Sequence, residues 1–345
     1  MNILIFTKGT RQTGMGHVQR QLVLAGELAK RGHHVDFLTY SDTPGLKRIG
    51  DWIGTSGHDI ELIAVLNDDD VARYVNHCPY HIIIMDIEHG PKRRLLEAAM
   101  RYDHKTVVID GVGFAIEDQK AIDDLVDLQV YQSVGLNTEA VTSYGRTKFP
   151  SNQLIGLEYV IIDQSYLDYR NGKLPFIDNT GTLISMGGAD PHGMSVEIAQ
   201  TINAIPRYKP VKVVLGPATA TSHLGHRNQW LGDSQVIIAP NILAPLMASS
   251  IVLITALGMT VYEALCVGIP VVCTAWSEDH EATALKLEAL GAITYLGQWD
   301  KIDWSKLVTF LNAMQNEYTR QMIGNIGMRL VDGLGVKRVA DAIEA

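Results

Sequence analysis

Short apolar runs alternate with amphipathic segments along nearly the whole chain. In the first half, the apolar runs cover residues 3–6, 35–39, 60–65, 82–85 and 106–109. Their short lengths and apolar character predict buried strands of a parallel sheet. Between them lie helical patterns at 18–30 and 92–102, the second with Leu95, Leu96, Ala99 and Met100 along one face. Strands that alternate with helices in this way predict a doubly wound α/β domain.

The same alternation begins again in the second half, which predicts two domains. Apolar runs recur at 182–185, 211–215, 236–238, 251–254 and 271–273. A segment rich in polar residues, Tyr, Gly and Pro separates the two sets. We therefore expect a Rossmann-like domain at 1–162, a linker at 163–180 and a second Rossmann-like domain at 181–345. The last helix of the second domain is a candidate to cross back to the N-terminal domain. Two such domains would face a cleft, and open α/β sheets bind ligands at the carboxyl ends of their strands.

The composition of the chain argues against some classes of function but does not identify one. The chain has 345 residues, 46% of them hydrophobic, which suffices for two cores of ordinary size. Its formal net charge of −9 makes nucleic acid an unlikely partner. The three cysteines (Cys78, Cys266 and Cys273) lack metal-site spacing and fit a reducing cytosol. There is no signal peptide and no apolar run of about 18 residues, so we expect a cytoplasmic protein without a transmembrane segment.

Residues 255–272 form the most informative stretch. A buried strand runs into a turn at Gly258, Met259 and Thr260. The helix that follows carries Glu263 and ends at a Gly-Ile-Pro run. Backbone N–H groups at a helix N-terminus bind anions, and a nearby carboxylate accepts hydrogen bonds from ribose hydroxyls. The stretch therefore predicts a nucleoside diphosphate pocket, with an ordinary βαβ crossover as the alternative.

A second candidate site follows the first strand. Gly14 and Gly16 lead directly into the first helix, and glycine lets the backbone approach a ligand closely. His17 stands where the loop becomes the helix, and histidine is a suitable proton carrier near neutral pH. Arg20, one turn further, is placed to contact a phosphate. The alternative is a helix-capping or solvated histidine.

Two loops of the second half complete the candidate set. Gly187 and Gly188 follow a strand and would let backbone N–H groups reach a phosphate, unless they form a plain turn. Asp279, His280 and Glu281 follow another strand and are placed to face sugar hydroxyls, with a solvated cluster at a helix start as the alternative. The acidic runs at 68–70 and 86–88 match no metal motif, so we expect neither a metal ion nor a cofactor.

The motifs at these positions resemble those of a known group. They are Gly-x-Gly-His-x-x-Arg at 14–20, Gly-x-Glu-Tyr at 156–159, Gly-Gly-x-Asp-Pro at 187–191, Gly-x-x-x-Tyr-Glu-Ala-Leu at 258–265, and glycine-containing runs at 291–297 and 333–339. Over nearly its full length the chain resembles the GT-B nucleotide-sugar enzymes. The resemblance is greatest to the group of the pseudaminic-acid-pathway UDP-sugar hydrolase and the spore-coat polysaccharide proteins. The peptidoglycan N-acetylglucosaminyltransferase shares the C-terminal part of the pattern.

This resemblance implies a role for each candidate. His17 would be the catalytic or water-positioning residue. Gly187 and Gly188 would face the diphosphate, Glu263 would face the ribose, and residues 279–281 would face the donor sugar. The resemblance thus implies binding of a UDP-sugar donor without a metal ion.

The chain departs from the group at three places. The group's Asp-x-Tyr run is Asp86-Ile87-Glu88 here, and its Asn-Gln pair is His280-Glu281. The first loop carries an unusual Lys8-Gly9-Thr10-Arg11-Gln12 run. These positions would surround the transferred sugar and the nucleophile, so the resemblance does not carry over hydrolysis of the same sugar.

We therefore predict a metal-independent GT-B glycosyltransferase that transfers a sugar from a UDP-sugar to an unknown acceptor. His17 would be the general base, with Glu88 or His89 as the reserve candidate, and Glu88 would bind the acceptor. A UDP-sugar hydrolase is the first alternative. A non-catalytic nucleotide-sugar-binding protein is the second.

Overall fold

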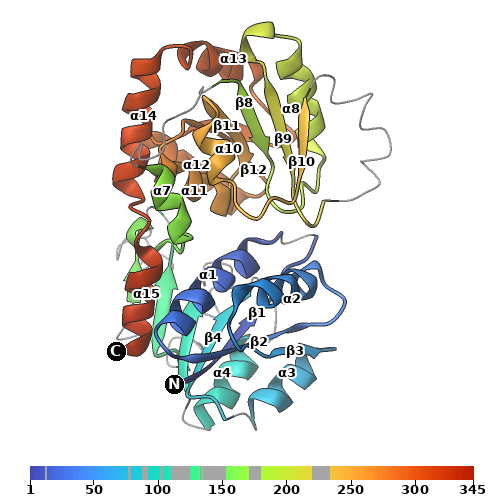
Figure 1. The fold of residues 1–345 in the computed structure, drawn as a ribbon, viewed down its shortest axis with the longest axis vertical. Coiled ribbons are helices and arrows are strands. Elements are labelled where there is room, and N and C mark those ends of the chain that lie inside the picture. The colour runs from blue at the N-terminus through green and yellow to red at the C-terminus, as the bar shows by residue number, and fades with distance from the viewer. Residues whose placement is uncertain are drawn as a thin grey trace. The chain divides into compact units, whose positions relative to one another are not determined.

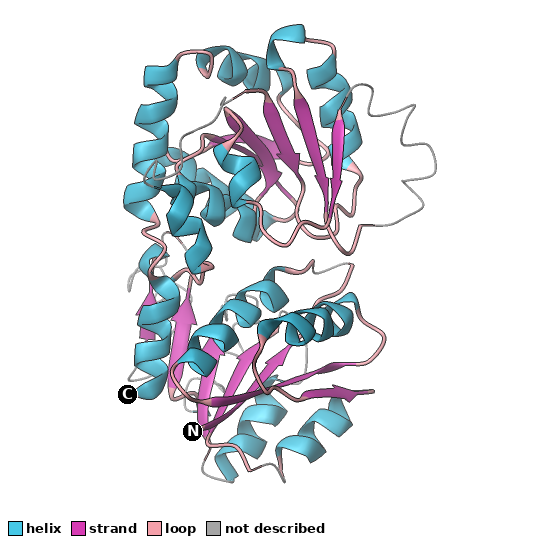
Figure 2. Ribbon diagram, viewed as in Figure 1, coloured by secondary structure: helices cyan, strands magenta, loops and turns pink. Residues whose placement is uncertain are grey.

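The computed structural model describes residues 1–11, 14–76, 79–87, 92–101, 104–109, 125–132, 134, 153–170, 180–219 and 234–345. The chain divides into two compact units (Figures 1 and 2). The first consists of Met1–Ile161 together with Leu334–Ala345, and the second of Ile162–Gly333.

The sheet of the first unit is parallel throughout its described strands. These are β1 (Asn2–Thr7), β2 (His34–Tyr40), β3 (Leu62–Val65), β4 (Ile82–Asp86), β5 (Lys105–Ile109), β6 (Leu128–Tyr131) and β7 (Gln153–Ile155). Their order is β3-β2-β1-β4-β5-β6-β7, with β1 paired to β2 on one side and to β4 on the other. The direction of winding therefore reverses between β1 and β4, and open α/β sheets bind ligands outside the strand ends at such a reversal.

Helices cover both faces of this sheet (Figure 1). The described helices are α1 (Gly16–Lys30), α2 (Pro44–Ser56), α3 (Asp68–Val75), α4 (Lys92–Arg101), the 3₁₀ helix η3 (Leu157–Tyr159) and α15 (Gly335–Glu344). On one face, Leu4, Phe6, Met85 and Val108 pack with side chains of α3 and α4 in a continuous core. The hydrophobic alternation along the strands produces this core, because successive side chains point to opposite faces.

The last helix of the chain belongs to the first unit. α15 packs beside α1, and the guanidinium of Arg31, just after α1, binds the carboxylates of Asp341 and Glu344 at 2.7 and 2.8 Å. Gly335 begins α15 so close to the backbone of Val160 that a Cβ would lie 2.2 Å from its carbonyl oxygen. A glycine is therefore required where the chain returns to this unit.

The second unit repeats the architecture of the first. Its strands are β8 (Thr182–Ser185), β9 (Val211–Leu215), β10 (Gln235–Ile238), β11 (Val252–Ala256), β12 (Val271–Ala275) and β13 (Thr294–Gln298). They are parallel and follow the order β10-β9-β8-β11-β12-β13. The reversal in this sheet lies between β8 and β11.

The helices of the second unit again lie on both faces of the sheet (Figure 2). They are η4 (Gln164–Tyr166), α7 (Leu167–Arg170), α8 (Met194–Asn203), η5 (Pro206–Tyr208), α10 (Ala244–Ala248), α11 (Met259–Val267), α12 (Glu278–Ala289), α13 (Trp304–Ala313) and α14 (Glu317–Leu330). Residues of α8 and α13, including Ile198, Ile202, Leu307 and Leu311, pack on one face in a shared core. α11 packs against α14 and α10.

The segment expected to be a linker has structure of its own. Its described part, 163–170, forms η4 and α7 within the second unit, where Gln164 Nε2 donates to the Gly333 carbonyl at 2.8 Å. The Arg170 guanidinium donates to the carbonyls of Val331 and Met328 after and within α14. Polar composition alone does not reveal such packing, because these side chains bond to backbone carbonyls.

Candidate functional site

The first group of predicted residues lies at the winding reversal of the first unit. β1 ends at Thr7, and α1 begins at Gly16 with His17 as its second residue. Gly14 has a φ of 76°, a left-handed conformation that favours glycine. The loop between them approaches α2 closely, since a Cβ on Gly45 would lie 2.8 Å from the Gly9 nitrogen. The sequence Gly14 to His17 is thus held at the carboxyl end of β1.

Asp86, the last residue of β4, is the centre of a buried polar cluster. Its side chain is fully buried, and Thr7 of β1 is its partner in the strand register. His17 Nδ1 lies 2.6 Å from Oδ1, and Arg20 contacts both carboxylate oxygens through Nη2 at 2.5 Å and Nε at 2.6 Å. Gln21 Nε2 donates to Oδ2 at 2.7 Å. The carboxylate therefore accepts hydrogen bonds from three residues of the first turns of α1.

Electrostatics keeps Asp86 ionised. Burial alone would raise the pKa of its carboxyl group, but the charges and hydrogen bonds of Arg20 and His17 outweigh burial and hold that pKa well below its usual range. A bidentate guanidinium is the geometry that best compensates a buried carboxylate.

The same contacts determine which nitrogen of the neutral His17 ring carries the proton. A carboxylate can only accept a hydrogen bond, so the proton of neutral His17 sits on Nδ1 and Nε2 carries the lone pair. Arg20 Nη2 also lies 2.9 Å from Nδ1, but both groups are then donors, so this approach is a close contact and not a hydrogen bond. The His17 side chain is 15% exposed. The arrangement orients a histidine whose second nitrogen can take up a proton.

Sequence reasoning missed the central residue of this cluster. Asp86 appeared there in an acidic run and in the segment that corresponds to the group's Asp-x-Tyr run, but without a role of its own, because its pairing with His17 depends on β4 lying beside β1. Arg20, expected to contact a phosphate, is instead 5% exposed and engaged with Asp86. Glu88 and His89 lie outside the described residues.

The loop after β8 has a built-in helix cap. Gly187 has a φ of 80°, and the carbonyl of Gly188 accepts from the Ala218 N–H at 2.8 Å. The Asp190 carboxylate, 5% exposed, accepts from the backbone N–H groups of Met194 and Ser195 at 2.9 and 3.1 Å. Asp190 thus satisfies the first N–H groups of α8. Gly187 and Gly188 precede it in the same loop.

The beginning of α11 differs from that of α8. Gly258 precedes it, and no side chain caps its first turn. Met259, Thr260 and Glu263 are each partly exposed, whereas Val261, Tyr262 and Ala264 are buried. Residues three and four apart share one face of a helix, so Glu263 lies one turn behind the open N-terminus on the same side. The loop after β11 thus combines an uncapped helix start with a carboxyl group.

Burial and neighbouring groups together raise the pKa of the Glu263 carboxyl group to about 7. Burial raises this pKa most, the hydroxyl of Tyr166 in η4 lowers it, and the negative charge of Asp163 raises it. Glu263 is therefore partly protonated at neutral pH.

The start of α12 is capped by a side chain, and Glu281 in its first turns is hydrogen-bonded to β13. Ser277 Oγ accepts from the backbone N–H of His280 at 3.3 Å. Glu281 accepts from Tyr295 Oη at 2.9 Å and from Gln298 Nε2 at 2.8 Å, so both of its oxygens are engaged with β13. The side chain of Asp279 lies outside the described part of the structure.

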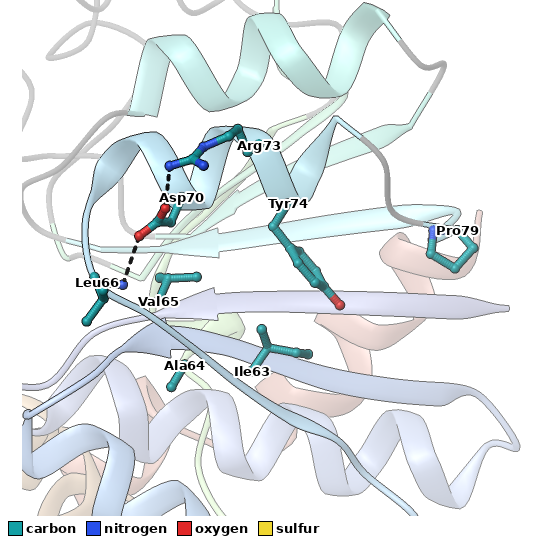
Figure 3. Close-up of a pocket in the computed structure, with 8 residues that line it drawn as sticks. All are labelled: Ile63, Ala64, Val65, Leu66, Asp70, Arg73, Tyr74 and Pro79. Atoms are coloured by element: carbon teal, nitrogen blue, oxygen red, sulfur yellow. Dashed lines mark hydrogen bonds and ion pairs between the residues drawn. The ribbon is translucent and has the colours of Figure 1, made fainter.

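A concave pocket lies elsewhere, at the edge of the first sheet (Figure 3). It has a volume of about 620 Å³ and is lined by Ile63, Ala64, Val65, Leu66, Asp70, Arg73, Tyr74 and Pro79. The Asp70 carboxylate there binds the Arg73 guanidinium at 2.6 Å. None of the candidate residues lines this pocket.

Among the described residues, no three His, Cys, Asp or Glu side chains gather in a way that could hold a metal ion. Among the same residues, no helix has both the length and the apolar character needed to cross a membrane.

Comparisons with known proteins place the fold. No family model matches the chain. It is 24% identical to the spore coat polysaccharide biosynthesis protein SpsG of Bacillus subtilis, over all of this chain and 98% of that protein. The structure is similar to the glycotransferase of kitacinnamycin, with a TM-score of 0.64, 17% identity and coverage of 99% and 98% of the two chains.

A second solved structure has the same fold with a different activity in its name. It is the UDP-GlcNAc 2-epimerase from Neisseria meningitidis bound to UDP-GlcNAc, with a TM-score of 0.64, 11% identity and coverage of 99% of each chain. Both similarities extend over two parallel sheets of the kind described above. The expected architecture is confirmed: the chain has the GT-B fold, with two Rossmann-like units.

Proposed function

We propose that the protein is a nucleotide-sugar enzyme of GT-B type that transfers a sugar from a UDP-sugar to an acceptor without a metal ion. The observation that carries the proposal is the start of α11, where an uncapped helix N-terminus and Glu263 share one open face at a winding reversal. One helical turn, about 5.4 Å, separates them, which matches the separation of a diphosphate from its ribose.

The donor would be held by the second unit. Backbone N–H groups at Gly258, Met259 and Thr260 would bind the diphosphate, with Gly187 and Gly188 on the neighbouring β8 loop. Glu263 would accept hydrogen bonds from ribose hydroxyls. The α12 segment would face the sugar through Asp279 and His280, while Glu281 supports β13 through Tyr295 and Gln298.

The first unit would supply the base. His17 Nε2 takes the proton of the attacking acceptor hydroxyl as its oxygen bonds to the anomeric carbon, and the bond from that carbon to the diphosphate oxygen breaks. UDP leaves with the bonding electron pair, stabilised by the helix N-terminus. Asp86 stabilises the imidazolium that forms, and Arg20 becomes a positioning residue for Asp86. Glu88 remains the proposed acceptor-binding carboxylate.

Hydrolysis is the second candidate, because the His17–Asp86 pair can activate a water as well as an acceptor hydroxyl. The name of the relative SpsG supports a role in polysaccharide biosynthesis. The proteins of similar fold include both a glycotransferase and a UDP-GlcNAc epimerase. The name of the epimerase also makes UDP-GlcNAc a reasonable first donor to test.

The experiment is a panel of UDP-sugars incubated with the purified protein, with and without cell extract, and analysed by mass spectrometry. Transfer predicts slow release of UDP from donor alone and a glycosylated product when extract supplies the acceptor. Fast release of free sugar and UDP without extract would favour hydrolysis. No turnover of any donor under either condition would favour a non-catalytic binding protein.

A further inference from the structure

Three aromatic rings from three different loops meet in the second unit. The imidazole of His192 is stacked on the indole of Trp299, with ring centroids 3.7 Å apart and ring planes inclined by 7°. The indole of Trp276 lies 5.2 Å from the same imidazole, tilted by 39°. His192 is exposed, whereas both tryptophans are partly buried against the core of the unit. The two indoles therefore hold an imidazole that reaches solvent.

The backbone fixes the position of each ring. Trp276 directly follows β12 and Trp299 directly follows β13, and the Trp299 N–H donates to the last carbonyl of β12 at 3.0 Å. His192 is the third residue of a turn, which is closed by a hydrogen bond of 3.1 Å from the Gly193 N–H to the Asp190 carbonyl. A ligand that binds these rings would have little to order, which favours affinity.

The stack occupies the faces of the His192 ring and leaves its polar edge to other partners. Within the described part of the chain, neither ring nitrogen of His192 has a hydrogen-bond or ion-pair partner. His17 and His33, by contrast, each contact a carboxylate. A neutral imidazole offers one donor and one acceptor, which are the two roles that a sugar hydroxyl also plays. His192 is therefore an oriented side chain suited to recognise a neutral polar ligand.

The rings come from loops to which donor binding is assigned above. His192 follows Gly187 and Gly188 in the loop after β8, and Trp276 immediately precedes Ser277, the N-cap of α12. Both indoles pack on the core that contains α8 and α13, whereas the diphosphate is assigned to the start of α11, which packs against α10 and α14. The position of the stack therefore favours the sugar part of the donor over its diphosphate.

We propose that His192 recognises the transferred sugar, by hydrogen bonds from its ring nitrogens to polar groups of that sugar. Trp299 and Trp276 are positioning residues, which hold the imidazole by its faces. The inference rests on the donor site proposed above for the second unit. It makes the stack a determinant of which sugar the protein accepts.

The variant that separates recognition from packing is His192→Phe, which keeps an aromatic ring on Trp299 and removes both nitrogens. Calorimetric titration should show an affinity for UDP-GlcNAc about three- to tenfold below that of wild type, the usual effect of losing a neutral hydrogen bond. The affinity for UDP should not change, because UDP lacks the sugar. A histidine that only covered Trp299 would be replaced by Phe without loss of affinity for either ligand.

Two further variants test the control and the positioning role. His58→Phe is the matched control, because His58 contacts Trp52 in the first unit, with centroids 6.4 Å apart and a tilt of 39°. It should bind both ligands as wild type does. Trp299→Leu should weaken UDP-GlcNAc binding, and adding His192→Phe should cost little more, because the two side chains act through one contact. Additive losses in the double variant would show that Trp299 does not position His192.

The outcomes separate this inference from the donor site on which it rests. Weaker binding of UDP-GlcNAc with unchanged binding of UDP in His192→Phe, and no change in His58→Phe, supports the inference. Unchanged affinity for both ligands in His192→Phe, or an equal loss for both, overturns it and leaves the proposed site at α11 standing. Failure of the wild-type protein to bind either ligand would instead refute the donor site, and the inference with it.

Discussion

His17 Nδ1 lies 2.6 Å from Oδ1 of Asp86, although 69 positions separate the two residues. The contact exists because β1 and β4 are neighbours in the sheet: Asp86 is the last residue of β4, and His17 lies at the start of α1, after the loop that follows β1. A carboxylate that holds Nδ1 orients the ring and stabilises the imidazolium, which is the arrangement that a general base requires.

Replacing His17 with alanine should slow turnover strongly without removing donor binding. We expect His17→Ala to lose about 10²- to 10⁴-fold in rate, the usual contribution of a general base, while its affinity for UDP is retained. Initial rates with the active donor and calorimetric titration with UDP measure the two effects. His33→Ala is the control, since His33 also binds a carboxylate of the first unit, Glu344, at 2.6 Å. Equal rates for His17→Ala and wild type would remove His17 from the mechanism.

Removing the charge of Asp86 should destabilise the protein strongly. Asp86→Asn removes the buried negative charge that pairs with the guanidinium of Arg20, and breaking such a buried pair typically costs about 3–5 kcal/mol. Urea unfolding at pH 7 measures this change. The control is Asp51→Asn, because Asp51 forms an exposed ion pair with Lys47 and should change stability by less than about 1 kcal/mol. Similar losses in the two variants would mean that the Asp86 cluster does not stabilise the fold.

Glu263 should make stability depend on pH in an unusual direction. Its pKa is raised from about 4.5 to about 7, so the folded protein binds a proton that the unfolded chain has released. Stability is therefore lost as pH rises from about 4.5, and the loss is complete above about 7. Glu263→Gln should consequently raise the melting temperature at pH 8.5 but change it little at pH 4.5.

The control for this pH effect is Glu197→Gln, at an exposed glutamate of α8 in the same unit. It should give the same difference from wild type at both pH values. A Glu263→Gln variant no more stable than wild type at pH 8.5 would contradict the environment described for Glu263.

The strands were predictable from the sequence because they depend on local patterns. The apolar runs matched the observed strands closely: the run at 182–185 is β8 without change, and the run at 251–254 became Val252–Ala256. His17, Gly258 and Glu263 were candidates because each lies where the chain passes from a strand into a helix, and their roles remain predictions. The helix at 18–30 begins two residues earlier, at Gly16.

Interactions between distant segments were not predictable in the same way. Asp86 and Tyr166 act through partners far away in sequence, and no periodicity reports such contacts. Asp86 was given no role of its own in the sequence analysis, yet its side chain is fully buried and bonded to residues of α1. Tyr166 lay in a segment whose polar composition indicated a linker, whereas its buried hydroxyl accepts a hydrogen bond from the Leu243 N–H.

The central claim is that α11 and Glu263 form the binding site for the nucleotide of the donor. Calorimetric titration of UDP at pH 8.5, where Glu263 is ionised, tests it most directly with wild type and Glu263→Ala. Loss of charge-assisted hydrogen bonds to the ribose should cost about 1.5–3 kcal/mol, or roughly 10- to 150-fold in affinity, while the variant remains folded. Equal affinity of the two folded proteins for UDP, or no binding of UDP by wild type, would contradict the account.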